Sequence, residues 1–243
     1  MKTTGHAEIT ASAEELGPGG EVRDSLRVVV SCLCVLCALC GYLLAEEFTR
    51  VSHYRVRMFS YGTLTVDTRM GDLQVEGWDE PRLEIEAEKV VQAKSAAKTQ
   101  PLYDEIKIQI EGGDKRVWVR TLYPPRRLWR PFRGGTKLSV NYRIRMPYDA
   151  NLILKCVDGD VRVRGIVGHQ QIHVNYGDVE INIPSVYRLR LLSARTWLGY
   201  VQSDLHGEDH AGFTPRLSFW NPTGDQDIVV RVRMGGVYVY SDR

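Results

Sequence analysis

The fold is decided by a short phrase that the chain repeats, and its fullest copy is CVDGDVRVRGIVG (Cys156–Gly168). Related copies are RMGDLQVEGW (Arg69–Trp78), NYGDVEINIP (Asn175–Pro184) and RMGGVYVYSD (Arg233–Asp242). Each has a glycine, often followed by an aspartate, and then alternating apolar and polar residues. Glycine permits the positive φ of a tight corner, and the alternation is typical of a strand with one buried face. The phrase therefore predicts a corner followed by a short strand.

The spacing of the corners favours stacked coils. Gly159, Gly177 and Gly199 follow one another at intervals of 18 and 22 residues, which is about one coil of a stacked-strand solenoid. A single coil cannot bury its apolar face alone, so repetition closes a shared core. The alternative for the same signals is a β-sandwich, whose turns recur roughly every 8 to 12 residues.

The same alternation runs through the chain from Tyr54 onward and predicts an all-β domain. The alternating apolar residues include Leu64, Val66, Leu83, Ile85, Val117, Val119, Val140, Tyr142, Ile144, Ile172, Val174, Val179 and Ile181. The best candidate for a helix is Val90–Glu105, which Pro101 interrupts. The predicted fold is thus a single-stranded β-solenoid or β-helix-like domain.

Composition indicates a folded chain without a strong charge bias. The 243 residues are 43% apolar and 26% charged, with a net charge of +2, which excludes wholesale disorder and gives no global argument for nucleic-acid binding. Cys32, Cys34, Cys37 and Cys40 are crowded together, and Cys156 is alone in the β region. One cysteine cannot form an internal disulfide framework there.

A membrane anchor is expected near the N-terminus. Val28–Ala45 holds 18 residues without a charge, just enough for a helix that spans a bilayer. We expect a flexible polar tail (1–25), a transmembrane signal anchor (26–45), a linker (46–58) and the β domain (59–243). A cleaved signal peptide is the alternative, because Arg23 and Arg27 precede the apolar run and Ala45 could precede a cut.

The orientation follows from size rather than charge. Arginines lie on both sides of the expected anchor, so the positive-inside rule does not choose a side, whereas long domains translocate largely regardless of their charge. We therefore expect a single-pass membrane protein with its β domain on the extracytoplasmic side.

A basic segment within the β region is the first candidate binding site. Residues 116–145 contain no acidic residue, and prolines there prevent a regular helix. The candidate contacts with an anionic surface are Arg126, Arg127, Trp129, Arg130, Phe132, Arg133 and Lys137. Arginine pairs with phosphate, and aromatic rings enter the interfacial zone of a bilayer, so anionic lipid or an anionic envelope polymer is the expected partner. Single-stranded nucleic acid is less favoured, and a solvated hairpin tip is the alternative.

Catalytic chemistry is thinly represented, and the sequence predicts no catalytic residue, no metal site and no cofactor. His206 and His210 lie four residues apart among acidic residues, but no helix holds them on one face. Cys156 continues the alternation of Leu152 and Leu154, so it is expected in the core. Asp158, Asp160 and Asp178 lie at corners, where backbone hydrogen bonds account for them.

The order of these motifs resembles a known family. GDLQVEGWDEPRLEIEAEKV, then VNYRIRMPYDANLILKCVDGDVRVRGIVG, then INIP and GGVYVYSD are similar to the bacterial putative-adhesin domain of unknown function, a toast-rack-like β-solenoid. The resemblance covers about residues 59–243, and the basic segment 116–145 departs from it as an insertion. It implies a β domain of the cell envelope, commonly tethered to a membrane, with no known catalytic residue.

The expected function is non-enzymatic: a membrane-anchored envelope module for binding, adhesion or envelope sensing, with other envelope proteins as further partners. Two alternatives stay open. One is an enzyme that acts on an envelope polymer, and the other is a secreted binding domain whose signal peptide has been cleaved.

Overall fold

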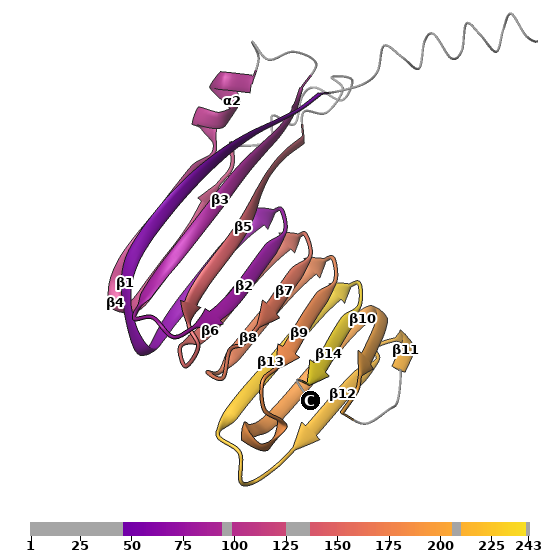
Figure 1. Ribbon diagram of the computed structural model, residues 1–243. Coiled ribbons are helices and arrows are strands. Elements are labelled where there is room, and N and C mark those ends of the chain that lie inside the picture. Colours follow the sequence, from indigo (N-terminus) through magenta and orange to yellow (C-terminus); the bar gives the residue numbers. More distant parts are fainter. Residues whose placement is uncertain (1–45, 94–98, 125–136, 206–209, 242–243) are drawn as a thin grey trace, which may run out of the picture. The chain divides into compact units, whose positions relative to one another are not determined.

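The corner glycines direct the path of the chain in a computed structural model, which describes residues 46–93, 99–124, 137–205 and 210–241 (Figure 1). All of these residues fall in one compact unit, Ala45–Arg243. The expected tail (1–25) and anchor (26–45) lie outside the described residues. Over the residues that are described, no helix has the length and apolar character needed to cross a membrane.

The described part of the chain is almost entirely β, as the alternation predicts. The strands are β1 (Glu46–Met70), β2 (Leu73–Trp78), β3 (Arg82–Ala93), β4 (Lys107–Leu122), β5 (Lys137–Pro147), β6 (Asn151–Asp158), β7 (Val161–Arg164), β8 (Gln170–Tyr176), β9 (Val179–Ile183), β10 (Leu189–Ser203), β11 (His210–Phe213), β12 (Arg216–Trp220), β13 (Gln226–Met234) and β14 (Val237–Ser241). One short helix, α2 (Thr99–Glu105), and one 3-10 turn, η2 (Val186–Arg188), interrupt them. Pro101 lies in the first turn of α2, where a missing N–H does not break the helix.

Each coil supplies one strand to each of two parallel columns. On one side of the corners β1, β6, β8, β13 and β10 pair in parallel. On the other side β2, β7, β9 and β14 do the same, with Leu73, Val161, Val179 and Val237 in register. The coils therefore stack as the glycine period predicts (Figure 1).

The order of the stack differs from the order of the chain. The period predicts that Gly177 is followed in space by Gly199, but the N–H of Gly177 donates to Met234 O at 3.1 Å. Gly235 then donates to Leu198 O at 3.0 Å, so the coil of Gly235 lies between them. After β9 the chain continues through η2 to β10, which lies one coil position further along the stack. The position between them is occupied later in the sequence by β13 and β14. The predicted neighbour relation was wrong at this point.

Antiparallel strands complete the two ends of the sheet. The first half of β1 pairs antiparallel with β3, which pairs antiparallel with β5, and β12 pairs antiparallel with β10. Because β14 pairs with both β9 and β10, the pairing path closes on itself around the core. The fold is therefore a set of stacked coils with antiparallel ends rather than a uniform solenoid.

The ends of the basic segment 116–145 belong to this core. Val117 and Val119 in β4, and Val140 and Ile144 in β5, are buried. The segment is therefore not an insertion outside the sheet over its whole length: its two ends are strands whose apolar residues the core requires. Its central part, 125–136, lies outside the described residues.

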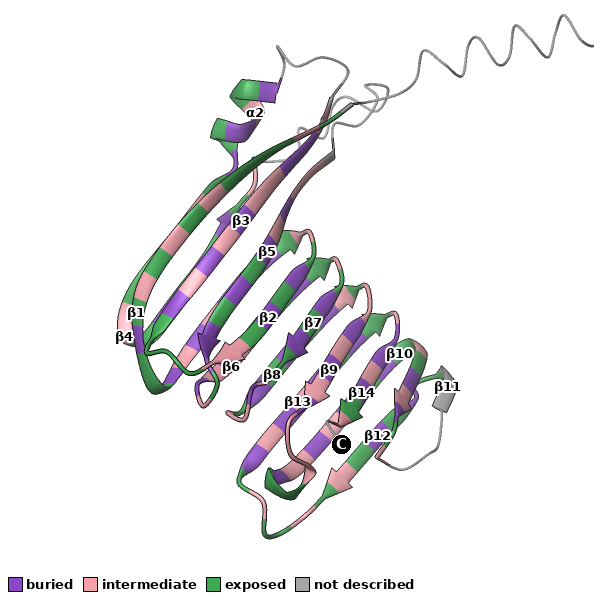
Figure 2. Ribbon diagram, in the orientation of Figure 1, coloured by how far each residue is buried: buried purple, intermediate pink, exposed green. Residues whose placement is uncertain are grey.

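Alternation fills the core, as the banding of buried and exposed residues along each strand shows (Figure 2). The aspartates that follow the corner glycines hold the coils together. Oδ1 of Asp72 accepts from the N–H of Asp160 at 3.0 Å, Oδ1 of Asp160 from Asp178 at 2.9 Å, and Oδ1 of Asp178 from Gly236 at 2.7 Å. This aspartate ladder uses the carboxylates to bind the backbone. A backbone role was expected for Asp160 and Asp178, but the N–H groups they bind belong to the next coil rather than to their own corner, and the Asp158 carboxylate is not part of the ladder.

Candidate functional site

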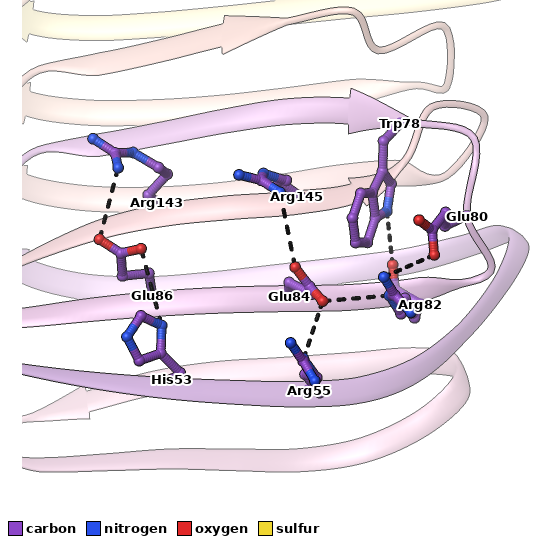
Figure 3. A network of polar contacts seen from close by, with 9 residues as sticks. All are labelled: His53, Arg55, Trp78, Glu80, Arg82, Glu84, Glu86, Arg143 and Arg145. Atoms are coloured by element: carbon purple, nitrogen blue, oxygen red, sulfur yellow. Dashed lines mark hydrogen bonds and ion pairs between the residues drawn. The ribbon is translucent and has the colours of Figure 1, made fainter.

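One outer face of the sheet carries charges that neutralise one another. Figure 3 shows its centre, where the Glu84 carboxylate lies 3.1 Å from Arg55, 3.4 Å from Arg82 and 3.9 Å from Arg145. Two residues further along the same strands, Glu86 lies 3.7 Å from Arg143 and 3.9 Å from His53. We call this surface, on β1, β3, β5, β2, β7 and β9, the paired face.

The register of the strands produces this pairing. Arg55 lies opposite Glu84, and Glu84 lies opposite Arg145, so opposite charges alternate across neighbouring strands. Further along the same face Glu180 binds Arg162 at 3.4 Å and Arg164 at 3.1 Å. Exposed ion pairs of this kind contribute about 0–1 kcal/mol each, and together they leave the face with little net charge.

The indole of Trp78 lies at one end of the paired face. Trp78 lies under the guanidinium groups of Arg82 and Arg145, at 5.0 and 5.9 Å from its ring centroid, and its Nε1 donates to Arg82 O at 2.9 Å (Figure 3). A hollow of about 410 Å³ runs between Arg55, Glu84 and Arg145. Since each of these cations already has a carboxylate partner, the hollow is a poor site for a further anion.

The outer face of the other column is different, because five of its basic residues form no ion pair with a described residue, although Arg190 on this face pairs with Asp227, and Asp67 of β1 lies opposite Lys155. Lys155, His173, Arg231, Arg195 and Arg216 lie opposite one another on the adjacent strands β6, β8, β13, β10 and β12. We call these residues the basic row. All five are exposed, and no ion pair or hydrogen bond joins their charged groups to another described residue.

Such a row costs stability. Neighbouring strands lie about 4.8 Å apart, so five residues span about 19 Å, and like charges directly opposite one another are destabilising. Four of the five residues are lysine or arginine, and the fifth is His173. A local violation of this kind, which has no compensation within the fold, is typical of a functional surface.

A groove follows the last coils beside the basic row. It has a volume of about 780 Å³ and is lined by Arg195, Arg216, Arg231 and Arg233, together with His173, Asn175 and Trp197. No carboxylate is among the residues that line it. The groove therefore offers several guanidinium groups, which bind carboxylate or phosphate oxygens in pairs.

Most of the predicted site residues are outside the part of the chain that the structure describes. Arg126, Arg127, Trp129, Arg130, Phe132 and Arg133 lie outside the described residues. Lys137 is the first residue of β5, and its backbone lies opposite Gln92 of β3. The basic row was missed at the sequence level, although a signal exists: Lys155, His173, Arg195 and Arg231 each stand four residues before a corner glycine, at Gly159, Gly177, Gly199 and Gly235.

Three side chains that could act as a nucleophile, a base or a metal ligand are either buried or hydrogen-bonded. Cys156 is buried, as predicted, and its burial raises the pKa of its thiol to about 12, so it is a weak nucleophile. Nδ1 of His169 accepts from the N–H of Asp227 at 3.1 Å, and Asp204 accepts from the N–H and the hydroxyl of Ser241. Within the part of the chain that the structure describes, no three histidine, cysteine or acidic residues form a group that could hold a metal ion.

Comparison with known proteins gives a structural likeness only. No family model matches the chain, and no curated protein matches it. The crystal structure of a "putative cell adhesion protein" from Clostridium sporogenes has a TM-score of 0.50 and 11% sequence identity, over 81% of this chain and 100% of that one. The two proteins share a fold.

The resemblance seen in the sequence is thus confirmed at the level of the fold. Two further solved structures, each a "putative adhesin", come from Parabacteroides distasonis and Bacteroides fragilis. Their TM-scores are 0.26 and 0.23, their identities are 10% and 11%, and they cover 79% and 80% of this chain over 70% and 97% of their own. TM-scores as low as these do not by themselves show a shared fold.

Proposed function

We propose that this protein is a non-enzymatic binding module of the cell envelope, which holds an anionic envelope component on its basic face. The observation that carries this proposal is the contrast between the two outer faces. Cations of the paired face are matched by glutamates, whereas the basic row and Arg233 have no partner among the described residues. The solved structure that shares the fold is called a "putative cell adhesion protein", and that name supports a binding role.

The enzyme alternative is less well supported. It requires carboxylates free to act on successive coils, but Asp160 and Asp178 accept hydrogen bonds from the backbone of the next coil. The basic face binds by charge and needs no reacting group. Adhesion and envelope sensing both require this binding step. We therefore propose the broader class, a binding module of the cell envelope.

Two further elements belong to this proposal. Residues 26–45 anchor the chain as a single-pass helix with the β domain on the extracytoplasmic side, and mass spectrometry of the mature protein should find the original N-terminal region retained. A mature chain that begins at Glu46 would instead show a cleaved signal. The basic segment (116–145) is a second proposed contact with anionic partners, through Arg126, Arg127, Trp129, Arg130, Phe132, Arg133 and Lys137.

The binding proposal is tested with the full chain in nanodiscs of neutral lipid, using dextran sulfate as the polyanion and unmodified dextran as the neutral probe. Binding of dextran sulfate should fall steeply with salt, because the charges are exposed. The double variant Arg195→Gln/Arg231→Gln should weaken it strongly. A control variant, Arg162→Gln/Arg164→Gln, removes the same charge from the paired face and should bind like the unmodified protein.

Two results would contradict the proposal. One is a chain that does not bind dextran sulfate at low salt. The other is an equal loss of binding in both double variants, which would mean that net charge alone, rather than the arrangement of the basic row, governs binding.

A further inference from the structure

A column of exposed apolar side chains runs beside the basic row, at the corners of the last coils. Tyr176, Met234, Leu198 and Phe213 lie opposite one another on β8, β13, β10 and β11. Their exposed fractions are 44%, 38%, 36% and 78%. We call these four residues the apolar corner. Contiguous exposed apolar groups of this kind mark surfaces that contact another molecule.

The apolar corner accompanies most of the basic row. At the corresponding position β1 has Met70 and β6 has Asp158, so an acidic residue separates Met70 from the apolar corner on the strand that carries Lys155. An apolar residue at the corner is therefore not required by every coil. The apolar corner is continuous only on the strands that carry His173, Arg231 and Arg195, and on β11.

The basic row and the apolar corner meet where the coils bend. His173, Arg231 and Arg195 each precede a member of the apolar corner by three residues, which is about 10 Å along a strand. Because side chains alternate along a strand, the apolar residues do not point from the outer face that carries the cations; they are exposed because they lie at the strand end, next to a corner glycine. Trp197 lies on the outer face two residues after Arg195 and is 52% exposed, and its ring meets Phe213 edge to face at 6.4 Å between centroids. The outer face thus carries a row of cations, and the adjoining corners carry a ridge of aromatic and aliphatic groups.

We infer that this surface docks on the face of an anionic lipid bilayer, an assignment that rests on the proposed function and names its partner. The cations of the basic row would lie among lipid phosphates, where a cluster of Lys and Arg side chains is attracted by the surface potential. The apolar corner and Trp197 would enter the boundary between headgroups and acyl chains, as the apolar face of an interfacial helix does.

The apolar corner is the reason to favour lipid over a soluble polyanion. A polysaccharide or nucleic-acid chain would be held by the cations, with aromatic rings as stacking surfaces. Leu198 and Met234 are of little use to such a partner, since neither side chain stacks or donates a hydrogen bond. Both gain from transfer into hydrocarbon, which is roughly proportional to the apolar area removed from water.

The test uses a fragment that begins at Glu46, because Ala45–Arg243 forms one compact unit with its own core and because the fragment lacks the expected anchor. Its folding is verified by circular dichroism and thermal melting. Binding is measured by cosedimentation with vesicles of phosphatidylcholine, with and without phosphatidylglycerol. The fragment should bind the anionic vesicles and should not bind the neutral ones.

Two variants separate the two parts of the surface. Arg195→Gln/Arg231→Gln should weaken binding about 30-fold at low salt, from the loss of two basic residues near an anionic surface. Met234→Ser/Phe213→Ser should weaken it about tenfold and should abolish the residual binding at high salt, where the apolar contribution remains. The controls are Arg162→Gln/Arg164→Gln on the paired face and Tyr187→Ser, an exposed aromatic away from the patch.

Each other outcome overturns the inference in a distinct way. Binding of dextran sulfate without binding of anionic vesicles would refute the lipid assignment and leave the proposed function standing, whereas binding of neither would refute both. If the Met234 and Phe213 variant binds vesicles like the unmodified fragment at every salt concentration, the apolar corner is not inserted. Unchanged binding by the arginine variant would move the contact to the predicted segment Arg126–Arg133.

Discussion

Replacing Gly177 by alanine tests the corner geometry on which the whole fold depends. Gly177 has a φ of +128°, which L side chains rarely adopt. A Cβ at this position would lie 2.3 Å from the carbonyl oxygen of Gly159 in the neighbouring coil. The obstacle is backbone rather than the end of a flexible side chain, so the coil itself must move.

The cost can be worked out from the contacts of the corner. Residues held in such a backbone conformation store about 1–3 kcal/mol of strain. The displacement also weakens two hydrogen bonds of the corner, Gly159 N–H to Tyr176 O at 3.0 Å and Gly177 N–H to Met234 O at 3.1 Å. At about 1 kcal/mol for each hydrogen bond, the total loss is about 4 kcal/mol.

Thermal unfolding followed by circular dichroism measures this loss. A domain of this size loses about 2–4 °C in Tm for each kcal/mol, so Gly177→Ala should lower the Tm by about 10 °C. Gly113 supplies the control, because a Cβ there meets nothing within 4 Å, and Gly113→Ala should cause no loss. A Gly177→Ala protein that melts within about 2 °C of the unmodified protein would refute the corner assignment.

Four further predictions concern named side chains. Because burial raises the pKa of the Cys156 thiol to about 12, iodoacetamide at pH 8 should label this residue only in denaturant; peptide mass mapping of the native protein would reveal any exception. The hydrogen bond from Arg190 lowers the pKa of Asp227, so its stabilisation is present above the unfolded-state pKa of about 4 and is lost as pH falls below that value. Asp227→Asn should therefore make the fall of Tm under acid shallower, and an unchanged slope would contradict this. Glu84→Gln leaves three arginines facing one another and should cost about 1 kcal/mol at low salt, but less at about 1 M salt, in urea titrations; a salt-independent cost would argue against ion pairing. Asp178→Ala removes the acceptor of the Gly236 N–H and should cost about 1–3 kcal/mol, whereas Asp158→Ala, which removes a carboxylate that accepts no hydrogen bond from the next coil, should cost less than about 0.5 kcal/mol; equal costs would contradict a stabilising role of the aspartate ladder.

Local features of the structure could be read from the sequence because they are fixed by near neighbours along the chain. The alternation at Leu152, Leu154 and Cys156 places all three in the core, as predicted. The glycine at Gly159 has the positive φ that its corner was expected to need. Both signals depend on backbone conformation and on the period of two residues in a strand, which do not change with the partner strand.

The pairing of coils could not be read in the same way. Parallel strands bind each other through the same backbone ladder at every coil, so the hydrogen bonds do not distinguish Gly199 from Gly235 as the neighbour of Gly177. The choice depends on which side chains of the whole stack pack together, and that is a property of distant residues. The sequence therefore predicts coils but not their order.

The basic row also combines a feature that is fixed by local sequence with one that depends on strand pairing. The sequence alone determined that Lys155, His173, Arg195 and Arg231 each face outward four residues before a glycine, because strand alternation fixes that direction. Only the tertiary structure decided that they form one continuous row, since Arg231 had to enter the stack between His173 and Arg195. Likewise the register alone gave Arg55 and Arg145 a shared glutamate, and placed His173, Arg231 and Arg195 opposite basic residues only. The physical reason is that a side chain's direction is set by its own backbone, whereas its neighbours are set by the strands that lie beside it.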